Sequence, residues 1–290
     1  MLKAMLRLTR PTQWLKNGVV VAALIFSGEA VHTGAAEVTA LAVVIFCLLS
    51  SSVYVFNDLV DCEKDRRHPL KKGRPIASGQ VPPTAAGIFS ALLLAVGLGA
   101  AWFINGAFFI VAVLYVVLNL AYSVRLKNVV IVDAMSIAVG FVLRAYAGAL
   151  AIDVPASKWL LINTLFLALF LAFGKRRHEL VFLEDKAVAH RRILSKYSPY
   201  LLDQLTGIVT ASVVVVYMLY TFSSEVSTKL GTENLFLTIP FVIYGIFRYL
   251  YLIHKEDGGG SPTSVLIGDR PILINVILWL ATVVVVLYFV

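Results

Sequence analysis

Long apolar runs alternate with short charged joints along the whole chain. A membrane-spanning helix needs about 20 mostly apolar residues, and nine segments come close to that length. They are residues 14–33, 38–56, 83–104, 107–123, 129–152, 159–173, 205–223, 235–253 and 271–290. The pattern predicts an all-α polytopic membrane protein with nine transmembrane helices. The first run is interrupted by Lys16, Asn17 and Glu29, and we expect it to be a retained anchor rather than a cleaved signal.

The composition supports this fold class. Hydrophobic residues make up 59% of the 290 residues, charged residues make up 14%, and the mean hydropathy is +0.85. A soluble domain of this length could not bury so much apolar surface in one core, and a typical soluble chain carries about 25% charged residues. The composition excludes the soluble, disordered and disulfide-rich secreted classes. It gives no sign of a nucleic-acid partner, so we expect none.

The basic residues are distributed unevenly between the joints. Of the 25 lysines and arginines, 21 lie at every second joint, two (Lys158 and Lys229) at the others, and two (Arg144 and Arg248) within spans. Cytoplasmic joints of membrane proteins carry an excess of basic residues. We therefore expect a cytoplasmic N-terminus, an external C-terminus, and cytoplasmic loops near 57–82, 124–128, 174–204 and 254–270.

An acidic motif follows the second run. Asn57, Asp58, Asp61 and Asp65 are spaced by one, three and four residues, which places them on one side of a helix continuing from that run. Like charges on one stripe repel and need a compensating cation. Hard oxygen ligands in this number suit Mg²⁺, so the four residues are candidate metal ligands. The alternative is a solvated helix end with Arg66 and Arg67 as ion-pair partners.

The stretch after the acidic motif is basic and rich in turn residues. It contains Arg66, Lys71, Lys72 and Arg74 between prolines and glycines, which break helices and permit tight turns. Such a loop is typical of an anion-binding site, with Arg74 as the best candidate for a bidentate phosphate contact. The alternative is a polybasic loop lying on anionic lipid headgroups.

These two stretches together resemble a known family. The run N-D-x-x-D-x-x-x-D, followed by R-x-H-P-x-K-x-x-R-P-I-A-S-G, is similar to the motif of the UbiA superfamily of intramembrane prenyltransferases. The resemblance implies nine helices around a central cavity, forming a single domain over residues 1–290. It also implies a Mg²⁺-bound diphosphate at the cytoplasmic end.

A second stretch departs from most of that family. Its second cytoplasmic loop usually carries a D-x-x-x-D motif, whereas this chain has Lys175, Arg176 and Arg177 there. The departure resembles one branch, the decaprenyl-phosphate phosphoribosyltransferases. The matching pieces are residues 10–17, 57–79, 174–176 and 196–197, and single residues including Tyr122, Lys127, Arg144 and Glu179.

The branch implies a reaction. It transfers 5-phosphoribose from phosphoribosyl pyrophosphate to a polyprenyl phosphate such as decaprenyl phosphate and releases pyrophosphate. The product is a precursor of arabinose donors for cell-wall polymers, and the location is the bacterial plasma membrane. The rival within the family is an aromatic prenyltransferase that uses a prenyl diphosphate. A transporter is disfavoured, because the carboxylates lie at one face rather than at the midplane.

Each candidate residue then has an expected role. The metal would be held by Asn57, Asp58, Asp61 and Asp65, with Asp58, Asp61 and Lys127 as catalytic residues. Lys175, Arg176 and Arg177 are expected to hold the 5-phosphate. The full set of substrate-binding candidates is Lys16, Arg66, Arg74, Tyr122, Lys127, Arg144, Lys175, Arg176 and Arg177.

Two points stay open on the sequence alone. Arg144 lies inside a span, where a charge is costly and marks a functional candidate; structural pairing and binding of the acceptor phosphate are both open. The oligomeric state is also open, and a homo-oligomer remains an alternative to a monomer.

Overall fold

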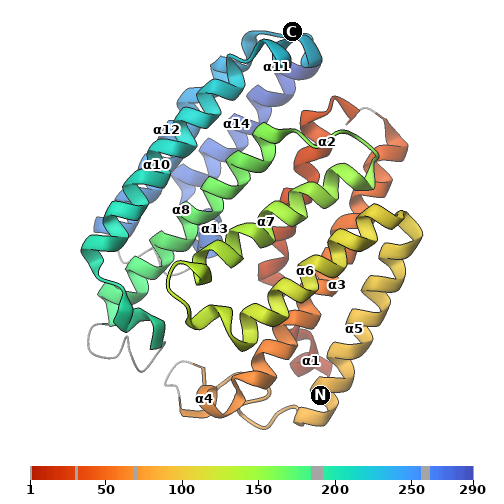
Figure 1. The fold of residues 1–290 in the computed structure, drawn as a ribbon, viewed down its shortest axis with the longest axis vertical. Coiled ribbons are helices and arrows are strands. Elements are labelled where there is room, and N and C mark those ends of the chain that lie inside the picture. The colour runs from red at the N-terminus through yellow and green to blue at the C-terminus, as the bar shows by residue number, and fades with distance from the viewer. Residues whose placement is uncertain (1, 30–31, 68–70, 184–191, 256–261, 290) are drawn as a thin grey trace. The chain divides into compact units, whose positions relative to one another are not determined.

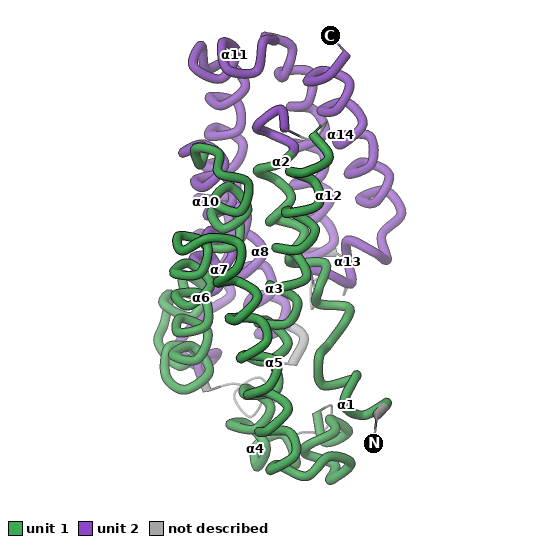
Figure 2. Tube along the Cα trace, turned by 90° about the vertical axis from the view of Figure 1, so that its right-hand side faces the viewer, with its two compact units in different colours: residues 1–24, 32–136, 143–156 green, residues 25–31, 137–142, 157–290 purple. Residues whose placement is uncertain are grey.

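The structure is a computed structural model that describes residues 2–29, 32–67, 71–183, 192–255 and 262–289 (Figure 1). Helices make up its regular structure, and the described residues contain no strand. The chain divides into two compact units, shown in two colours in Figure 2. Unit 1 comprises residues 1–24, 32–136 and 143–156, and unit 2 comprises residues 25–31, 137–142 and 157–290. The expectations for residues 68–70, 184–191 and 256–261 fall outside the described residues.

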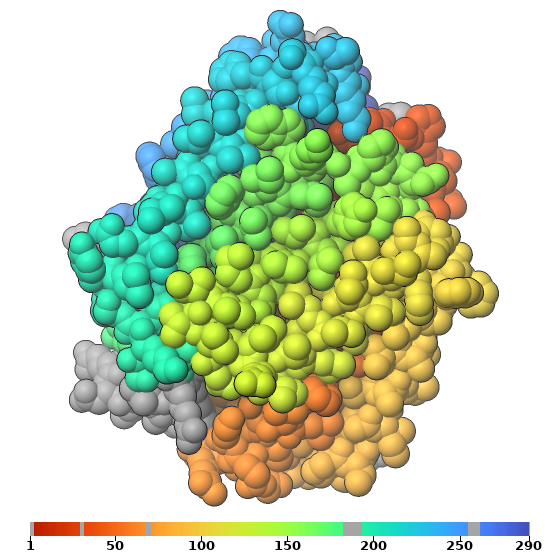
Figure 3. Space-filling model, in the orientation of Figure 1, coloured from red at the N-terminus to blue at the C-terminus, as the bar shows by residue number. Residues whose placement is uncertain are grey.

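Unit 1 contains the N-terminal helices and the acidic motif. Its elements are α1 (Leu2–Leu8), η1 (Pro11–Val21), the start of α2 (Ala22–Phe26), α3 (Thr33–Val60), α4 (Cys62–Arg67), α5 (Pro83–Ile104), α6 (Gly106–Val124), η3 (Leu126–Asn128) and most of α7 (Val132–Ala151). Its core is apolar and includes Phe46, Phe108 and Tyr115, whose rings meet edge to face. The α5 and α6 helices, orange-yellow to yellow in Figure 3, expose apolar side chains such as Leu92 and Leu114, as helices facing lipid should.

Unit 2 contains the remaining long helices. Its elements are α8 (Lys158–Leu183), η5 (Arg192–Lys196), α10 (Pro199–Thr221), α11 (Ser224–Leu230), η6 (Asn234–Thr238), α12 (Ile239–Lys255), α13 (Pro262–Gly268) and α14 (Arg270–Tyr288). Tyr217, Tyr220 and Val286 belong to one of its apolar clusters. An ideal Cβ at Gly174 would lie 2.7 Å from Ile253 Cδ1. Close packing of α8 on α12 therefore depends on the glycine just before the basic triplet.

Eight helices among the described residues are long and apolar enough to span a membrane. They correspond to the second to ninth predicted runs, which confirms an all-α multi-pass membrane protein. The first run instead forms a 3₁₀ helix, η1, followed by the short α2. At about 2.0 Å per residue in a 3₁₀ helix and 1.5 Å in an α-helix, the two are roughly 30 Å long together, about the hydrocarbon thickness. The count of nine and the central cavity stay predictions.

One predicted boundary is wrong. The sequence predicts that the sixth run ends at residue 173 and that a loop begins at 174, but α8 continues to Leu183. Arg176 is buried and donates a hydrogen bond from Nη1 to Glu179 Oε2 at 2.8 Å. This pair lies three residues apart on one helix face, where opposite charges stabilise the helix. The basic triplet is therefore helical, not part of a loop.

Candidate active site

The acidic motif lies where α3 gives way to α4. Asp61 caps α3 with φ −94° and ψ 4°, so the helix breaks there instead of continuing smoothly. Backbone hydrogen bonds still run from the Asp61 amide to the Asn57 carbonyl and from the Asp65 amide to the Asp61 carbonyl, at 3.0 and 2.8 Å. The near-helical path keeps the four polar residues close together.

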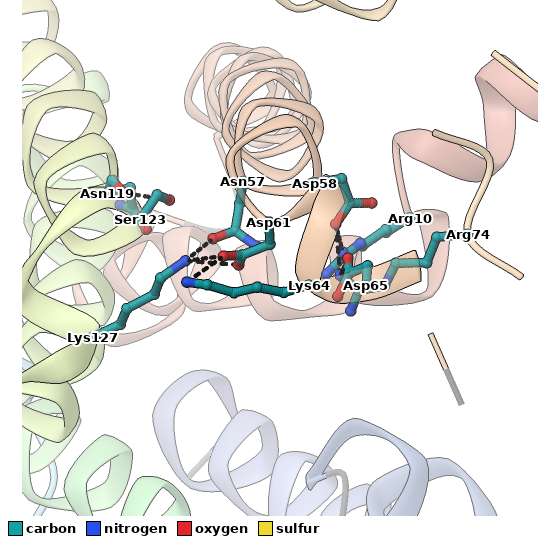
Figure 4. A network of polar contacts seen from close by, with 10 residues as sticks. All are labelled: Arg10, Asn57, Asp58, Asp61, Lys64, Asp65, Arg74, Asn119, Ser123 and Lys127. Carbon is teal, nitrogen blue, oxygen red and sulfur yellow. Dashed lines mark hydrogen bonds and ion pairs between the residues drawn. The ribbon is translucent and has the colours of Figure 1, made fainter. Parts of the chain in front are cut away.

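The four residues separate into two groups (Figure 4). At about 100° per residue, Asn57, Asp58, Asp61 and Asp65 point to about 0°, 100°, 40° and 80° around an ideal helix. Asn57 and Asp61 lie toward one edge of this stripe, and Asp58 and Asp65 lie toward the other. The single stripe expected from the spacing is in fact two neighbouring pairs. We call them the amide half (Asn57, Asp61) and the carboxylate half (Asp58, Asp65).

In the amide half, three oxygens surround the ammonium group of Lys127. Lys127 Nζ lies 2.8 and 2.7 Å from the two carboxylate oxygens of Asp61 and 3.4 Å from Asn57 Oδ1. Lys127 belongs to the short η3 turn after α6, which backbone hydrogen bonds from Asn128 and Val129 close. Lys64 approaches Asp61 at 3.8 Å and is largely exposed. A positive group therefore occupies the point where these oxygens converge.

In the carboxylate half, two arginines neutralise two buried acids. Arg10 Nη2 donates to Asp58 Oδ1, and Arg74 Nη1 donates to Asp58 Oδ1 and Asp65 Oδ2 at 2.9 and 2.7 Å. The four side chains form one chain of alternating charge that is neutral as a group. The compensating cation predicted for the motif is thus supplied by basic side chains from elsewhere in the sequence.

An apolar cluster fixes this arrangement. Leu8, Val55, Ile76 and Val81 are fully or almost fully buried against one another. Each critical charge lies two or three residues from one of these anchors: Arg10 follows Leu8, Asp58 follows Val55, and Arg74 precedes Ile76. Packing of the three chain segments therefore sets the ion pairs before any ligand binds.

The backbone at Arg10 is also constrained. Its φ of 51° and ψ of 64° lie in the left-handed region, and Pro11 follows at the start of η1. A non-glycine residue there costs roughly 1–3 kcal/mol and persists only where its surroundings hold it. Ser51 Oγ donates to the Thr9 carbonyl at 3.1 Å, and the Arg10 guanidinium lies 5.2 Å from the centroid of the Tyr54 ring. Two residues of helix α3 thus hold this turn, one through the Thr9 carbonyl and the other through the Arg10 side chain.

The other candidates of unit 1 have the following positions and contacts. Arg66 donates to the exposed Glu63 at 2.6 Å. Lys16 lies half-buried on η1, and Tyr122 lies half-buried near the end of α6. Arg144 is buried in α7, donates from Nη2 to the Tyr115 hydroxyl at 2.5 Å, and stacks 4.6 Å from that ring's centroid. This contact favours the structural reading of Arg144, whose role in binding the acceptor phosphate stays a prediction.

In unit 2, the basic triplet is engaged with acids of the same unit. Lys175 lies 3.7 Å from Glu179 Oε1, and Arg176 pairs with the same carboxylate. Arg177 Nε donates to Asp203 Oδ1 at 2.5 Å, and its Nη1 donates to the Ile253 carbonyl at 3.3 Å. The triplet therefore comes from a helix rather than a loop, and its role in binding the 5-phosphate stays a prediction.

Comparison with known proteins decides the family. The model of the UbiA prenyltransferase family matches residues 18–266. The chain belongs to the UbiA prenyltransferase family. It is 35% identical to decaprenyl-phosphate phosphoribosyltransferase of Mycolicibacterium smegmatis, covering 100% of this chain and 94% of that protein. The protein of the same name from Mycobacterium tuberculosis is also 35% identical, covering 94% of this chain and 91% of that one.

The fold is that of solved UbiA proteins. A UbiA homologue from Archaeoglobus fulgidus, solved with GPP and Mg²⁺ bound, matches with a TM-score of 0.72, covering 98% of this chain and 99% of that one at 21% identity. At this identity the likeness establishes the fold, while the site of this UbiA-family chain rests on its own residues.

The chemistry of the amide half fits Mg²⁺. Among the described residues, no three Asp, Glu, His or Cys side chains converge on one point. Mg²⁺ is usually held by only one or two carboxylates, with waters and substrate phosphates completing its shell. Asp61 and Asn57 could supply that share, since their oxygens already surround a cation. In this UbiA-family chain, Asp58 and Asp65 instead accept hydrogen bonds from arginines, and their role as metal ligands stays a prediction.

The sequence reasoning missed Arg10. In the sequence, Arg10 contributes to the basic excess that predicts membrane orientation and belongs to the matching piece 10–17. An arginine followed by proline before an apolar run was the available signal. It does not show that the side chain reaches an aspartate 48 residues later.

Proposed function

We propose that this protein transfers the 5-phosphoribosyl group of phosphoribosyl pyrophosphate to a polyprenyl phosphate, decaprenyl phosphate being the acceptor that its relatives' name specifies. An oxygen of the lipid phosphate attacks C1 of the ribose, the bond from C1 to the pyrophosphate oxygen breaks, and pyrophosphate leaves. The proposed place is the plasma membrane of a bacterium, with the acidic motif on the cytoplasmic side.

The observation that carries the proposal is the identity to two phosphoribosyltransferases over almost the whole of both chains. A chemical argument supports it. Phosphoribosyl pyrophosphate carries phosphates at both ends, and the lipid phosphate adds another anion. A site for three anionic groups needs many cations in a medium of low dielectric. Arg10, Arg74 and Lys127 contact the acidic motif, and the triplet 175–177 remains the expected partner of the 5-phosphate.

The roles of the residues follow from the two halves. Bound at Asn57 and Asp61, Mg²⁺ would offset the charge that develops on the departing pyrophosphate. Lys127 contacts the same oxygens of Asn57 and Asp61. Its ammonium group would therefore move to the diphosphate when the metal is bound. The nucleophile is a phosphate oxygen that is already anionic near neutral pH, so this reaction needs no strong general base. Positioning and charge stabilisation would supply most of the rate.

A competition between two donors tests the proposal. Membranes containing the protein receive Mg²⁺, ribose-labelled phosphoribosyl pyrophosphate, decaprenyl phosphate, a labelled prenyl diphosphate and a phenolic acceptor. We expect ribose label in the lipid extract, and none with membranes lacking the protein. Prenyl label on the phenol, without ribose label in lipid, would make the protein an aromatic prenyltransferase instead.

A further inference from the structure

The exposure of the side chains differs between the two halves of the acidic motif. In the carboxylate half, the side chains of Arg10 and Arg74 are each 27% exposed, whereas those of Asp58 and Asp65 are 3% and 6% exposed. In the amide half, Asp61 is 18% exposed and Lys127 12%. A ligand reaching the carboxylate half therefore meets guanidinium groups first. A ligand reaching the amide half meets a carboxylate at least as readily as an ammonium.

The two arginines keep donors for a further acceptor. A guanidinium carries five N–H donors in a rigid fork. Among the described residues, Arg74 contacts both aspartates through Nη1 alone, and Arg10 contacts Asp58 through Nη2. Most donors of both side chains lie outside these ion pairs. Because both arginines meet at one oxygen of Asp58, the remaining donors lie close to each other.

Packed segments support both arginines. Arg10 has a left-handed backbone followed by Pro11, and its guanidinium lies over the ring of Tyr54. Arg74 lies in the same segment as Ile76 and Val81, which are buried in an apolar cluster. Two cations are thus kept together by two acids that ligands scarcely reach. Such an arrangement binds anions well, because the cost of bringing like charges together is met by the fold before binding.

We propose that the two halves of the motif take different ligands. Arg10 and Arg74 form a guanidinium pair that binds a phosphate group of the donor directly, and Asp58 and Asp65 are positioning residues for that pair rather than metal ligands. The amide half, Asn57 and Asp61, takes the metal. This inference rests on the proposed function for the identity of the donor, and it adds Arg10 to the binding residues.

Two binding measurements on the purified full-length protein in detergent test the division without turnover. The first is calorimetry with inorganic pyrophosphate in the presence of EDTA. We expect Arg10→Ala to weaken binding about tenfold or more, as the loss of a charge-assisted hydrogen bond would. Arg10→Lys should restore only part of the affinity, because lysine keeps the charge but loses the fork. Arg7→Ala, which removes an exposed charge from the same segment, should leave binding unchanged.

The second measurement is electron paramagnetic resonance of Mn²⁺ added without pyrophosphate. We expect Asp61→Asn to weaken Mn²⁺ binding at least tenfold and Asp65→Asn to leave it within about twofold of the parent protein. Asp65→Asn should instead weaken pyrophosphate binding, because Arg74 loses one of its two supports.

Two results would overturn the inference. One is pyrophosphate binding by Arg10→Ala equal to that of the parent protein, with Arg10→Lys also unchanged. The other is a loss of Mn²⁺ affinity in Asp65→Asn as large as in Asp61→Asn, which would make Asp65 a metal ligand. Neither result depends on phosphoribosyl transfer. If transfer fails but both binding measurements give the expected results, the proposed function is wrong and the division of the motif stands.

Discussion

The amide half and the carboxylate half of the acidic motif share one short stretch of sequence but differ in burial and in partner. Asn57 and Asp61 surround a lysine from a turn 66 residues later than Asp61, and Asp61 stays partly accessible. Asp58 and Asp65 lie beneath two arginines that an apolar cluster fixes in place. The difference teaches that carboxylates at a spacing typical of metal ligands can have two different roles. Some present oxygen to a cation, and others hold cations ready for an anion.

The largest expected effect comes from removing the accessible carboxylate. Asp61→Ala should lower transfer about a thousandfold or more, because the amide half loses its carboxylate for Mg²⁺ and the leaving group loses its compensating charge. Initial rates of transfer in membranes with matched protein amounts measure this. Glu37→Ala is the control, since Glu37 is an exposed acid at the other end of α3. Near-normal turnover of Asp61→Ala would contradict the metal role of the amide half.

The next effect distinguishes the halves by stability. Asp58→Asn should destabilise the protein by about 3–5 kcal/mol, because it leaves two adjacent arginines without their shared buried acid. Asp61→Asn should cost clearly less, since Asp61 is more exposed. Thermal unfolding midpoints of both variants in the same detergent give the comparison. Equal midpoints would mean that the two acids contribute alike and that the division by burial has no energetic basis.

A smaller effect is expected at Lys127. Lys127→Ala should lower transfer about 10- to 100-fold, because one charge-assisted contact to the diphosphate is lost, while Lys127→Arg should recover part of the rate. Lys64→Ala, which removes the exposed lysine 3.8 Å from Asp61, should change the rate about twofold or less. The ratio of kcat to KM for the donor is the measurement. A larger loss with Lys64→Ala than with Lys127→Ala would reverse the assignment.

The smallest effect on stability is expected for an ion pair outside both halves, and this pair serves as their reference. Asp269 accepts hydrogen bonds from Arg248 at 2.8 Å and from the Ile272 amide at 2.9 Å, capping α14. The hydrogen bond from Arg248 is the main cause that holds the pKa of Asp269 below its ordinary value of 3.8, against a smaller effect of burial. A lowered pKa means that the pair stabilises the folded state above the ordinary pKa. That contribution is lost as the pH falls through the lower pKa of the folded state.

Asp269→Asn keeps a capping residue but removes the charge. The parent protein should therefore unfold at a slightly higher temperature than this variant between pH 5 and pH 7. The gap should close as the pH falls below about 4. A gap that widens toward acid would show that the sign of the coupling is opposite. Unfolding midpoints measured across that range decide the point.

Much of the fold follows from the apolar pattern. The run 83–104 coincides with α5, whose ends are marked by Pro82 and Pro83 and by Asn105. The pattern predicts the wrong helix end where charged residues continue a helix. In α8 the basic triplet continues the helix because Arg176 is buried beside Glu179. In the first run, apolar content alone does not distinguish a 3₁₀ helix from an α-helix, and Asn17 is buried there because Cys47 and Ser50 accept from its amide.

The site follows from the sequence only in part. The spacing of Asn57, Asp58, Asp61 and Asp65 locates the motif and its need for cations. It does not show which basic side chains pair with these acids. Arg10, Arg74 and Lys127 reach them because distant segments pack together, as Leu8 does with Val55 and Ile76. On an ideal helix Asp61 and Asp65 point only about 40° apart, as Asn57 and Asp61 do. The spacing alone therefore does not predict that Asp61 and Asp65 belong to different halves.

The most direct test of the account is a transfer reaction with doubly labelled donor. Purified protein in liposomes with decaprenyl phosphate and Mg²⁺ receives phosphoribosyl pyrophosphate that carries ¹⁴C in the ribose and ³²P in the pyrophosphate. We expect a lipid product that contains ¹⁴C without ³²P, with one labelled pyrophosphate released for each ribose transferred. Lipid that contains ³²P, or label that stays wholly in the aqueous phase, would contradict it.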